Sequence, residues 1–308
     1  MPTEQPNFDP SALPALQAVE TADGYRIAVR RFDPPPATAV RAAVIMASAM
    51  GVKQDFYAPF ARWLAAQGVA TYTFDCRGMF ASRPAGGLRG FPADISTWAG
   101  LDYAALIEQA SARHPGLPLF WIGHSLGGQI LGLIPNRDRI DAMLSIAVGS
   151  GYFRFNAKPM RYYAAFLWHV LMPLALRTTG YFPGKKLRAV GDLPYGVAAQ
   201  WRKWCLNVDY LGAEGNRVRE QLAQIEIPIT AFSIEDDELM TLRGTQALYS
   251  LYEHAPLEIR RVKPADHGLR AIGHFGFFRP KMQAALWPLV SAWVERRIEL
   301  LPEHARAS

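Results

Sequence analysis

The chain has 308 residues, of which 50% are hydrophobic and 19% charged. This balance suits a sizeable buried core and excludes disorder over most of the length. The formal net charge is +6, but the basic residues are dispersed in pairs such as Lys185-Lys186, so no nucleic-acid partner is predicted. The two cysteines, Cys76 and Cys205, form no C-x-x-C pair, and we expect both to be reduced and structural.

The N-terminal stretch Met1–Pro6 has neither a basic n-region nor an apolar h-region, so we expect no secretory signal and a cytoplasmic protein. The apolar run Tyr162–Leu176 spans about 15 residues, fewer than the roughly 20 needed to cross a bilayer. We therefore interpret it as a buried or partly exposed helix. Contact with a membrane surface and homo-oligomerisation both stay open.

The first predicted elements form a hairpin. The first fifteen residues are rich in proline and polar residues, which is typical of a loosely held arm. Leu16–Thr21 and Tyr25–Phe32 then have strand character on either side of Asp23-Gly24, a dipeptide that favours a tight turn.

After the hairpin, short apolar runs alternate with segments of helical periodicity. Strands are predicted at Ala42–Ala47, Val69–Phe74, Leu119–Ile122, Ala142–Val148, Ile227–Phe232 and Glu258–Val262. Helices are predicted at Asp55–Gln67, Ile95–Arg113, Leu126–Ile134, Leu242–His254 and Pro280–Leu300. This alternation indicates an α/β fold, with a mostly parallel sheet covered by helices on both faces.

One aromatic-rich segment breaks the alternation. Between residues 151 and 215 the chain contains thirteen Phe, Tyr and Trp residues and the turn Pro183-Gly184. We interpret residues 151–215 as an inserted helical cap, and residues 1–150 together with 216–308 as the α/β core.

A nucleophile motif lies between a predicted strand and a predicted helix. Gly123-His124-Ser125-Leu126-Gly127 fits the pattern Gly-x-Ser-x-Gly, in which the serine stands on a sharp turn that raises its hydroxyl above the sheet. Glycine is needed on both sides because the turn brings the backbone close to its neighbours. Ser125 is therefore the candidate nucleophile, and His124 is expected to pack beneath this turn.

An oxyanion hole requires two N–H donors near the serine. The Leu126 N–H, at the start of the following helix, is the first candidate. The second is expected in the loop Ser48–Gly51 after the strand Ala42–Ala47, with Ala49 preferred and Met50 as the alternative because the register is uncertain by one residue.

The acid and the base should follow the serine in the chain, on loops at the carboxyl ends of later strands. The strand Ile227–Phe232 leads into four consecutive acidic residues at positions 235–238, of which Asp237 is favoured over Asp236 as the triad acid. His274, flanked by Gly273 and Gly276, is favoured over His267 as the base.

With Ser125, an Asp at position 236 or 237 and His274 in this order, the chain resembles the α/β-hydrolase superfamily. Asp75-Cys76-Arg77-Gly78 is similar to an Asp-x-Arg-Gly turn of that superfamily. The ending Ile272–Arg279 resembles bacterial predicted α/β hydrolases related to the serine aminopeptidase and monoacylglycerol lipase-like branch. The resemblance covers roughly residues 16–300 and implies the α/β-hydrolase fold, and the ending also supports His274 as the base.

These observations predict a serine hydrolase that cleaves carboxylic esters through an acyl-enzyme intermediate. The aromatic cap indicates a small-molecule ester with an apolar or medium-chain acyl group, the alternative being that its aromatic residues only form the core of the cap itself. An acyltransferase, a peptidase and a non-catalytic binding protein on the same fold are the alternatives. No dinucleotide turn, phosphate loop or metal-spaced cluster occurs, so neither a cofactor nor a metal is expected.

Overall fold

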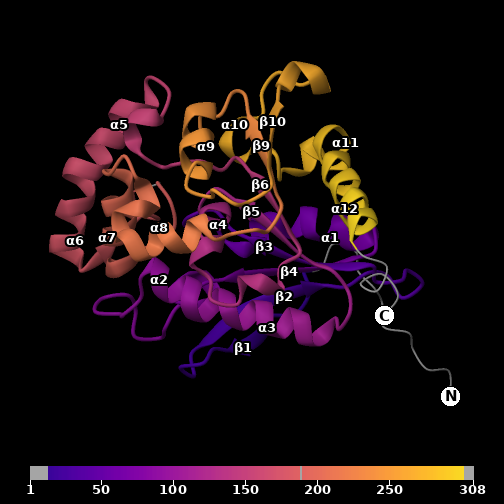
Figure 1. Cartoon of the computed structure of the whole chain (residues 1–308). Coiled ribbons are helices and arrows are strands. Elements are labelled where there is room, and N and C mark those ends of the chain that lie inside the picture. The colour runs from indigo at the N-terminus through magenta and orange to yellow at the C-terminus, as the bar shows by residue number, and fades with distance from the viewer. Residues whose placement is uncertain (1–12, 188, 302–308) are drawn as a thin grey trace.

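A twisted eight-stranded sheet forms the centre of the computed structural model, which describes residues 13–187 and 189–301 (Figure 1). The spatial order is β1-β2-β4-β3-β5-β6-β9-β10. The strands are β1 (Gln17–Glu20), β2 (Arg26–Phe32), β3 (Ala42–Ala47), β4 (Val69–Asp75), β5 (Leu119–His124), β6 (Ala142–Ile146), β9 (Ile229–Ile234) and β10 (Leu257–Val262). Strand β2 is antiparallel to β1 and β4, and the remaining pairs are parallel.

The helices cover both faces of the sheet because its central strands are buried on both sides. All six residues of β3 are buried, and successive side chains enter opposite apolar clusters. One cluster packs against α1 (Ala58–Ala66), α11 (Gln283–Leu286) and α12 (Pro288–Leu300). The other packs against α3 (Ala104–Arg113), α4 (Leu126–Gln129) and α9 (Leu242–Tyr249). The prediction of a mostly parallel, doubly covered sheet is confirmed.

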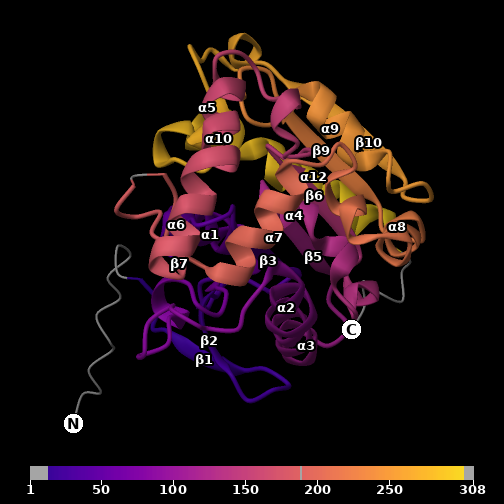
Figure 2. The same ribbon diagram turned by 90° about the vertical axis from the view of Figure 1, so that its left-hand side faces the viewer.

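The segment between β6 and β9 lies outside the sheet and supplies several of the labelled helices. In Figure 2 these helices lie in front of the strands. A continuous helical stretch comprises α5 (Met160–Phe166), a π-helical part (Leu167–Leu171) and α6 (Met172–Thr179). It is followed by the two-stranded sheet β7 (Tyr181–Phe182) and β8 (Leu193–Pro194), then by α7 (Tyr195–Cys205) and α8 (Asn216–Ala223). Buried side chains of this segment, Trp168 and Trp204 among them, continue the cluster that includes α3.

Several predicted helices are shorter or less regular than the sequence pattern indicates. The helix expected at Leu126–Ile134 ends as α4 at Gln129 and continues as a 3-10 turn at Leu131–Leu133. The one expected at Ile95–Arg113 is α2 (Ile95–Thr97), a π-helical part (Trp98–Tyr103) and then α3. The β7–β8 pair and α8 were not predicted. No helix within the described residues combines the length and the apolarity that a membrane span requires.

Candidate functional site

Ser125 lies on the turn between β5 and α4, at the carboxyl edge of the sheet. Its backbone has φ 50° and ψ −119°, a conformation that costs energy for a residue with a side chain. A Cβ on Gly127 would collide with the Ala47 carbonyl, and one on Gly123 would collide with the backbone of Gly128. The two glycines therefore allow the strained turn to form against β3. The Ser125 side chain is 7% exposed and lines a cavity.

The structure brings His274 and Asp237 together. His274 lies in the short helix α10 (Gly273–Gly276), and its Nδ1 is 2.7 Å from Asp237 Oδ2. Burial raises the pKa of Asp237, but the charge and hydrogen bond of His274 and the N–H groups of Leu239 and Met240 outweigh it, so the pKa lies below its ordinary value. An ionised Asp237 can therefore hold the imidazole in one orientation and tautomer.

Asp236 holds the backbone that precedes the histidine. Its Oδ2 accepts hydrogen bonds from the N–H groups of Ile272 at 2.8 Å and Gly273 at 3.1 Å. Its carboxylate is thus engaged with the loop, whereas that of Asp237 bonds the ring. His267, the other histidine considered, lies in a 3-10 turn (Pro264–His267) and does not line the cavity that contains Ser125.

The turn after β3 carries the two N–H groups considered as the second oxyanion donor, those of Ala49 and Met50. The Ala49 N–H already donates to Tyr57 Oη at 2.9 Å, so it is not free for a substrate. The Ala49 carbonyl accepts from the Val52 N–H at 3.1 Å across a turn in which Gly51 has φ 67°. Among the described residues, neither Met50 nor Leu126 has a partner for its N–H. On this turn the free N–H is therefore that of Met50, the alternative considered from the sequence, and not that of Ala49.

A cavity of about 320 Å³ joins these groups. Ser125, Met50 and His274 line it together with side chains from the segment between β6 and β9. The latter are almost all apolar: Met160, Tyr163, Ala164, Phe166, Leu167, Trp168, Leu171, Val190, Trp201 and Cys205. The described lining includes no Asp or Glu.

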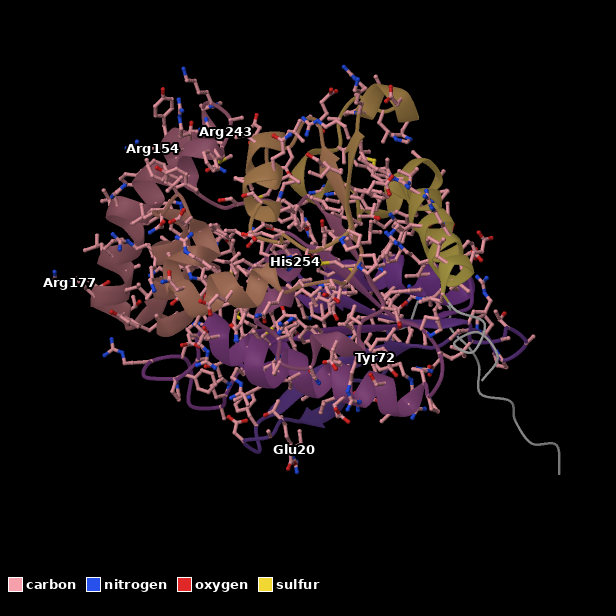
Figure 3. The ribbon with its side chains drawn as sticks, in the orientation of Figure 1. Glu20, Tyr72, Arg154, Arg177, Arg243 and His254 are labelled. Carbon is pink, nitrogen blue, oxygen red and sulfur yellow. The ribbon has the colours of Figure 1, made fainter. Side chains whose placement is uncertain are left out.

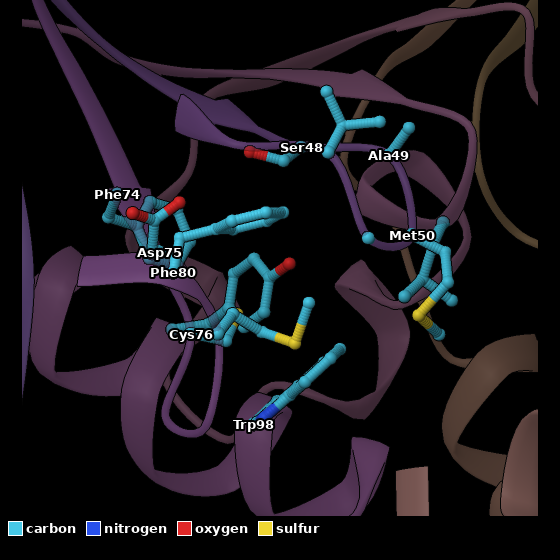
Figure 4. A pocket seen from close by; sticks show the side chains of 13 residues that line it. Ser48, Ala49, Met50, Phe74, Asp75, Cys76, Phe80 and Trp98 are labelled. Atoms are coloured by element: carbon cyan, nitrogen blue, oxygen red, sulfur yellow. The ribbon is translucent and has the colours of Figure 1, made fainter. Parts of the chain in front are cut away.

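A smaller cavity of about 20 Å³ lies against the same turn. Figure 4 shows Ser48, Ala49 and Met50 on one loop facing Asp75 and Cys76 at the end of β4. Its volume suffices for about one water molecule, so it does not offer room for an organic substrate.

Two buried residues beneath Ser125 were not assigned a site role from the sequence. His124 Nδ1 is 2.8 Å from Tyr57 Oη, and His124 Nε2 is 2.9 Å from the carbonyl oxygen of His274. Burial, followed by the nearby His274, lowers the pKa of His124 to about 3. His124 is therefore neutral at ordinary pH. Only its position inside the Gly-x-Ser-x-Gly motif could have drawn attention to it in the sequence.

Comparisons with known proteins agree with this architecture. A family model described as serine aminopeptidase, S33, matches residues 38–180. A soluble variant of the monoglyceride lipase of Saccharomyces cerevisiae, solved with a substrate analogue, superposes with TM-score 0.68 and 17% identity over 94% of this chain and 98% of the other. The chain therefore has the α/β-hydrolase fold, and residues 38–180 are similar to the serine aminopeptidase family.

Other solved α/β hydrolases give the same result. A thermostable carboxyl esterase from Bacillus coagulans, in complex with glycerol, has TM-score 0.64 and 13% identity, with 94% of this chain and 100% of the esterase covered. The monoacylglycerol lipase of Paleococcus ferrophilus has TM-score 0.56 and 15% identity, with coverage of 88% and 99%. At these identities the likeness describes the fold.

Proposed function

We propose that this chain is an α/β hydrolase that cleaves carboxylic esters, with Ser125 as nucleophile, His274 as base and Asp237 as the acid of a triad. The observation that carries the proposal is that Ser125, on a strained strand–helix turn, lines one cavity with His274. The Nδ1 of this histidine bonds the buried carboxylate of Asp237. These are the parts that acyl transfer through a serine requires.

In the proposed reaction, His274 removes the Ser125 proton as Oγ attacks the ester carbonyl. The negative charge that develops on the carbonyl oxygen is stabilised by the N–H groups of Met50 and Leu126. The alkoxide leaving group takes the proton from His274, and an acyl-enzyme remains. His274 then activates water, which releases the carboxylic acid and regenerates Ser125.

The cavity lining supports an apolar acyl or alkyl group in the substrate. We propose that residues 151–215 act as a cap over Ser125, because their side chains form most of the apolar lining. A peptidase that recognises a free α-amino group would need an anionic partner for that ammonium, and the described lining contains none. An acyltransferase would use the same residues, with an alcohol or amine in place of water.

The proposal is tested with purified protein, p-nitrophenyl esters of increasing chain length and a fluorophosphonate probe. We expect turnover and stoichiometric labelling, with Ser125→Ala folded, unlabelled and lower in kcat by about 10⁶-fold. No turnover and no labelling of the wild-type protein would overturn the proposal. An added alcohol that diverts the product from acid to a new ester would indicate acyl transfer.

A further inference from the structure

A chain of three hydrogen bonds connects the segments that carry the proposed catalytic groups. It runs from the Ala49 N–H to Tyr57 Oη, from Tyr57 Oη to His124 Nδ1, and from His124 Nε2 to the His274 carbonyl, over 2.9, 2.8 and 2.9 Å. The side chains of Tyr57 and His124 are completely buried. Water therefore cannot replace either partner without a change in packing.

The protons in this chain have one consistent arrangement. A carbonyl oxygen only accepts, so His124 Nε2 carries the hydrogen that it donates to His274. Because the ring is neutral, its Nδ1 has a lone pair and accepts from the Tyr57 hydroxyl. Burial raises the pKa of Tyr57 far above its ordinary value, so the hydroxyl keeps its proton, and its oxygen accepts from Ala49.

One end of the chain fixes the oxyanion turn. The Ala49 N–H is held by Tyr57, and the Ala49 carbonyl is held by the Val52 N–H at 3.1 Å. Since a trans peptide is planar, holding that carbonyl also fixes the direction of the Met50 N–H in the same peptide unit. A loss of the Tyr57 contact would free the residue that precedes this donor.

The other end fixes the base. His124 directly precedes Ser125 in the chain and holds the backbone carbonyl of His274, whose ring bonds Asp237. The chain of hydrogen bonds thus links the turn of the oxyanion donor, the nucleophile turn and the backbone of the base. Neither Tyr57 nor His124 lines the 320 Å³ cavity, so neither would touch a substrate.

We propose that Tyr57 and His124 are positioning residues of the ester-cleaving site. They hold the Met50 N–H and the His274 ring in the correct position relative to Ser125. This inference rests on the proposed function. A group that orients the catalytic groups without touching substrate affects the transition state more than the ground state. Removing either contact should therefore lower kcat and leave KM nearly unchanged.

The first test is Tyr57→Phe, which removes only the hydroxyl. We expect kcat to fall about 10- to 100-fold with KM changed less than about 2-fold, since small displacements of catalytic groups cost about this much. A trifluoromethyl ketone, which forms a tetrahedral adduct with serine, should bind more weakly by the same factor as kcat/KM. Fluorophosphonate titration gives the concentration of competent sites, so a partly unfolded sample is not mistaken for a slow enzyme.

Tyr249→Phe is the matched control, because Tyr249 is another buried tyrosine, whose hydroxyl bonds Ser145 on β6 away from the cavity. It should lower the melting temperature as much as Tyr57→Phe does and retain the wild-type kcat.

His124→Gln is the second variant, and its amide can still donate toward the His274 carbonyl. The double variant of His124→Gln and Tyr57→Phe should have a kcat no lower than that of the slower single variant.

Three outcomes would overturn the inference. Tyr57→Phe could retain a kcat per titrated site within 2-fold of wild type, its loss could appear in KM alone, or the two variants could act additively. Each leaves the proposed function intact if the wild-type enzyme is labelled and active. An unlabelled, inactive wild-type protein would remove the proposed function and this inference together.

Discussion

At the residue scale, the two neighbouring carboxylates of the 236–237 pair contact different parts of the same loop. Asp237 bonds the His274 ring, whereas Asp236 accepts from two backbone N–H groups just before it. The first contact can stabilise an imidazolium as it forms. The second one only fixes the backbone, so the two acids should differ sharply when each charge is removed.

Asp237→Asn should lower kcat by about 10⁴-fold, because an amide can support the wrong imidazole tautomer and cannot offset its positive charge. Asp236→Asn should lower kcat less than about 10-fold, since the asparagine oxygen can still accept from Ile272 and Gly273. Both rates are measured per site on a short p-nitrophenyl ester. If Asp236→Asn lowers kcat more than Asp237→Asn does, the roles proposed for the two residues are reversed.

At the element scale, the turn after β3 depends on a glycine for two separate reasons. Gly51 has φ 67°, and an added Cβ would lie 2.7 Å from Val190 Cβ and 2.8 Å from the Gly191 nitrogen. The Gly191 N–H also donates to the Gly51 carbonyl at 2.9 Å. The turn that carries Met50 is thus packed against the 151–215 segment.

Gly51→Ala should therefore destabilise the protein and also lower its kcat. The positive φ costs about 1–2 kcal/mol for a residue with a Cβ, and relief of the contact with Val190 would shift the turn, so kcat should fall by about 10-fold or more. The measurements are the melting temperature and kcat per titrated site.

Gly24→Ala provides the control for backbone strain alone. Gly24 has φ 80° in the β1–β2 turn, and a Cβ there meets nothing within 4 Å. This variant should lose stability without losing kcat. Equal kcat in Gly51→Ala and wild type would contradict the proposed part of the turn in catalysis.

The elements differ in how far the sequence predicts them. The strand at Ala42–Ala47 and the serine turn were predictable because their signals are local: a continuous apolar run, and glycines on both sides of a serine. The second donor was less predictable, because which N–H is free depends on Tyr57, eight positions away from Ala49. The contact between His124 and His274 spans 150 positions, and no local pattern predicts it.

At the scale of the whole molecule, the outer side of the α5–α6 stretch is unusually apolar. Tyr162, Tyr163, Phe166, Val170 and Leu174 are 61%, 68%, 58%, 49% and 58% exposed. Tyr162, Phe166, Val170 and Leu174 recur every four residues, which places these four along one side of the helix. Tyr163 and Phe166 also line the 320 Å³ cavity.

Basic side chains surround this apolar surface. Exposed Arg154 and Lys158 precede the helix and exposed Arg177 lies in its last turn; Figure 3 labels Arg154 and Arg177 on the outer side of these helices. Apolar side chains with a basic border suit an anionic lipid surface. We propose that the α5–α6 surface binds an anionic lipid membrane and that apolar esters enter the cavity from this membrane.

The combined variant Tyr162→Ser/Val170→Ser/Leu174→Ser tests this surface, because none of the three residues lines the cavity. Binding to vesicles that contain phosphatidylserine should weaken at least about 10-fold, since each exposed apolar side chain contributes on the order of 1 kcal/mol when it leaves water. Turnover of a short ester in solution should stay unchanged, whereas turnover of a long-chain ester carried in the vesicles should fall.

Leu300→Ser, which removes a 63% exposed leucine at the end of α12, is the control. It should change neither the binding to vesicles nor the turnover of the long-chain ester. Equal vesicle binding by the triple variant and the wild-type protein would contradict the proposed contact while leaving the reaction at Ser125 untouched.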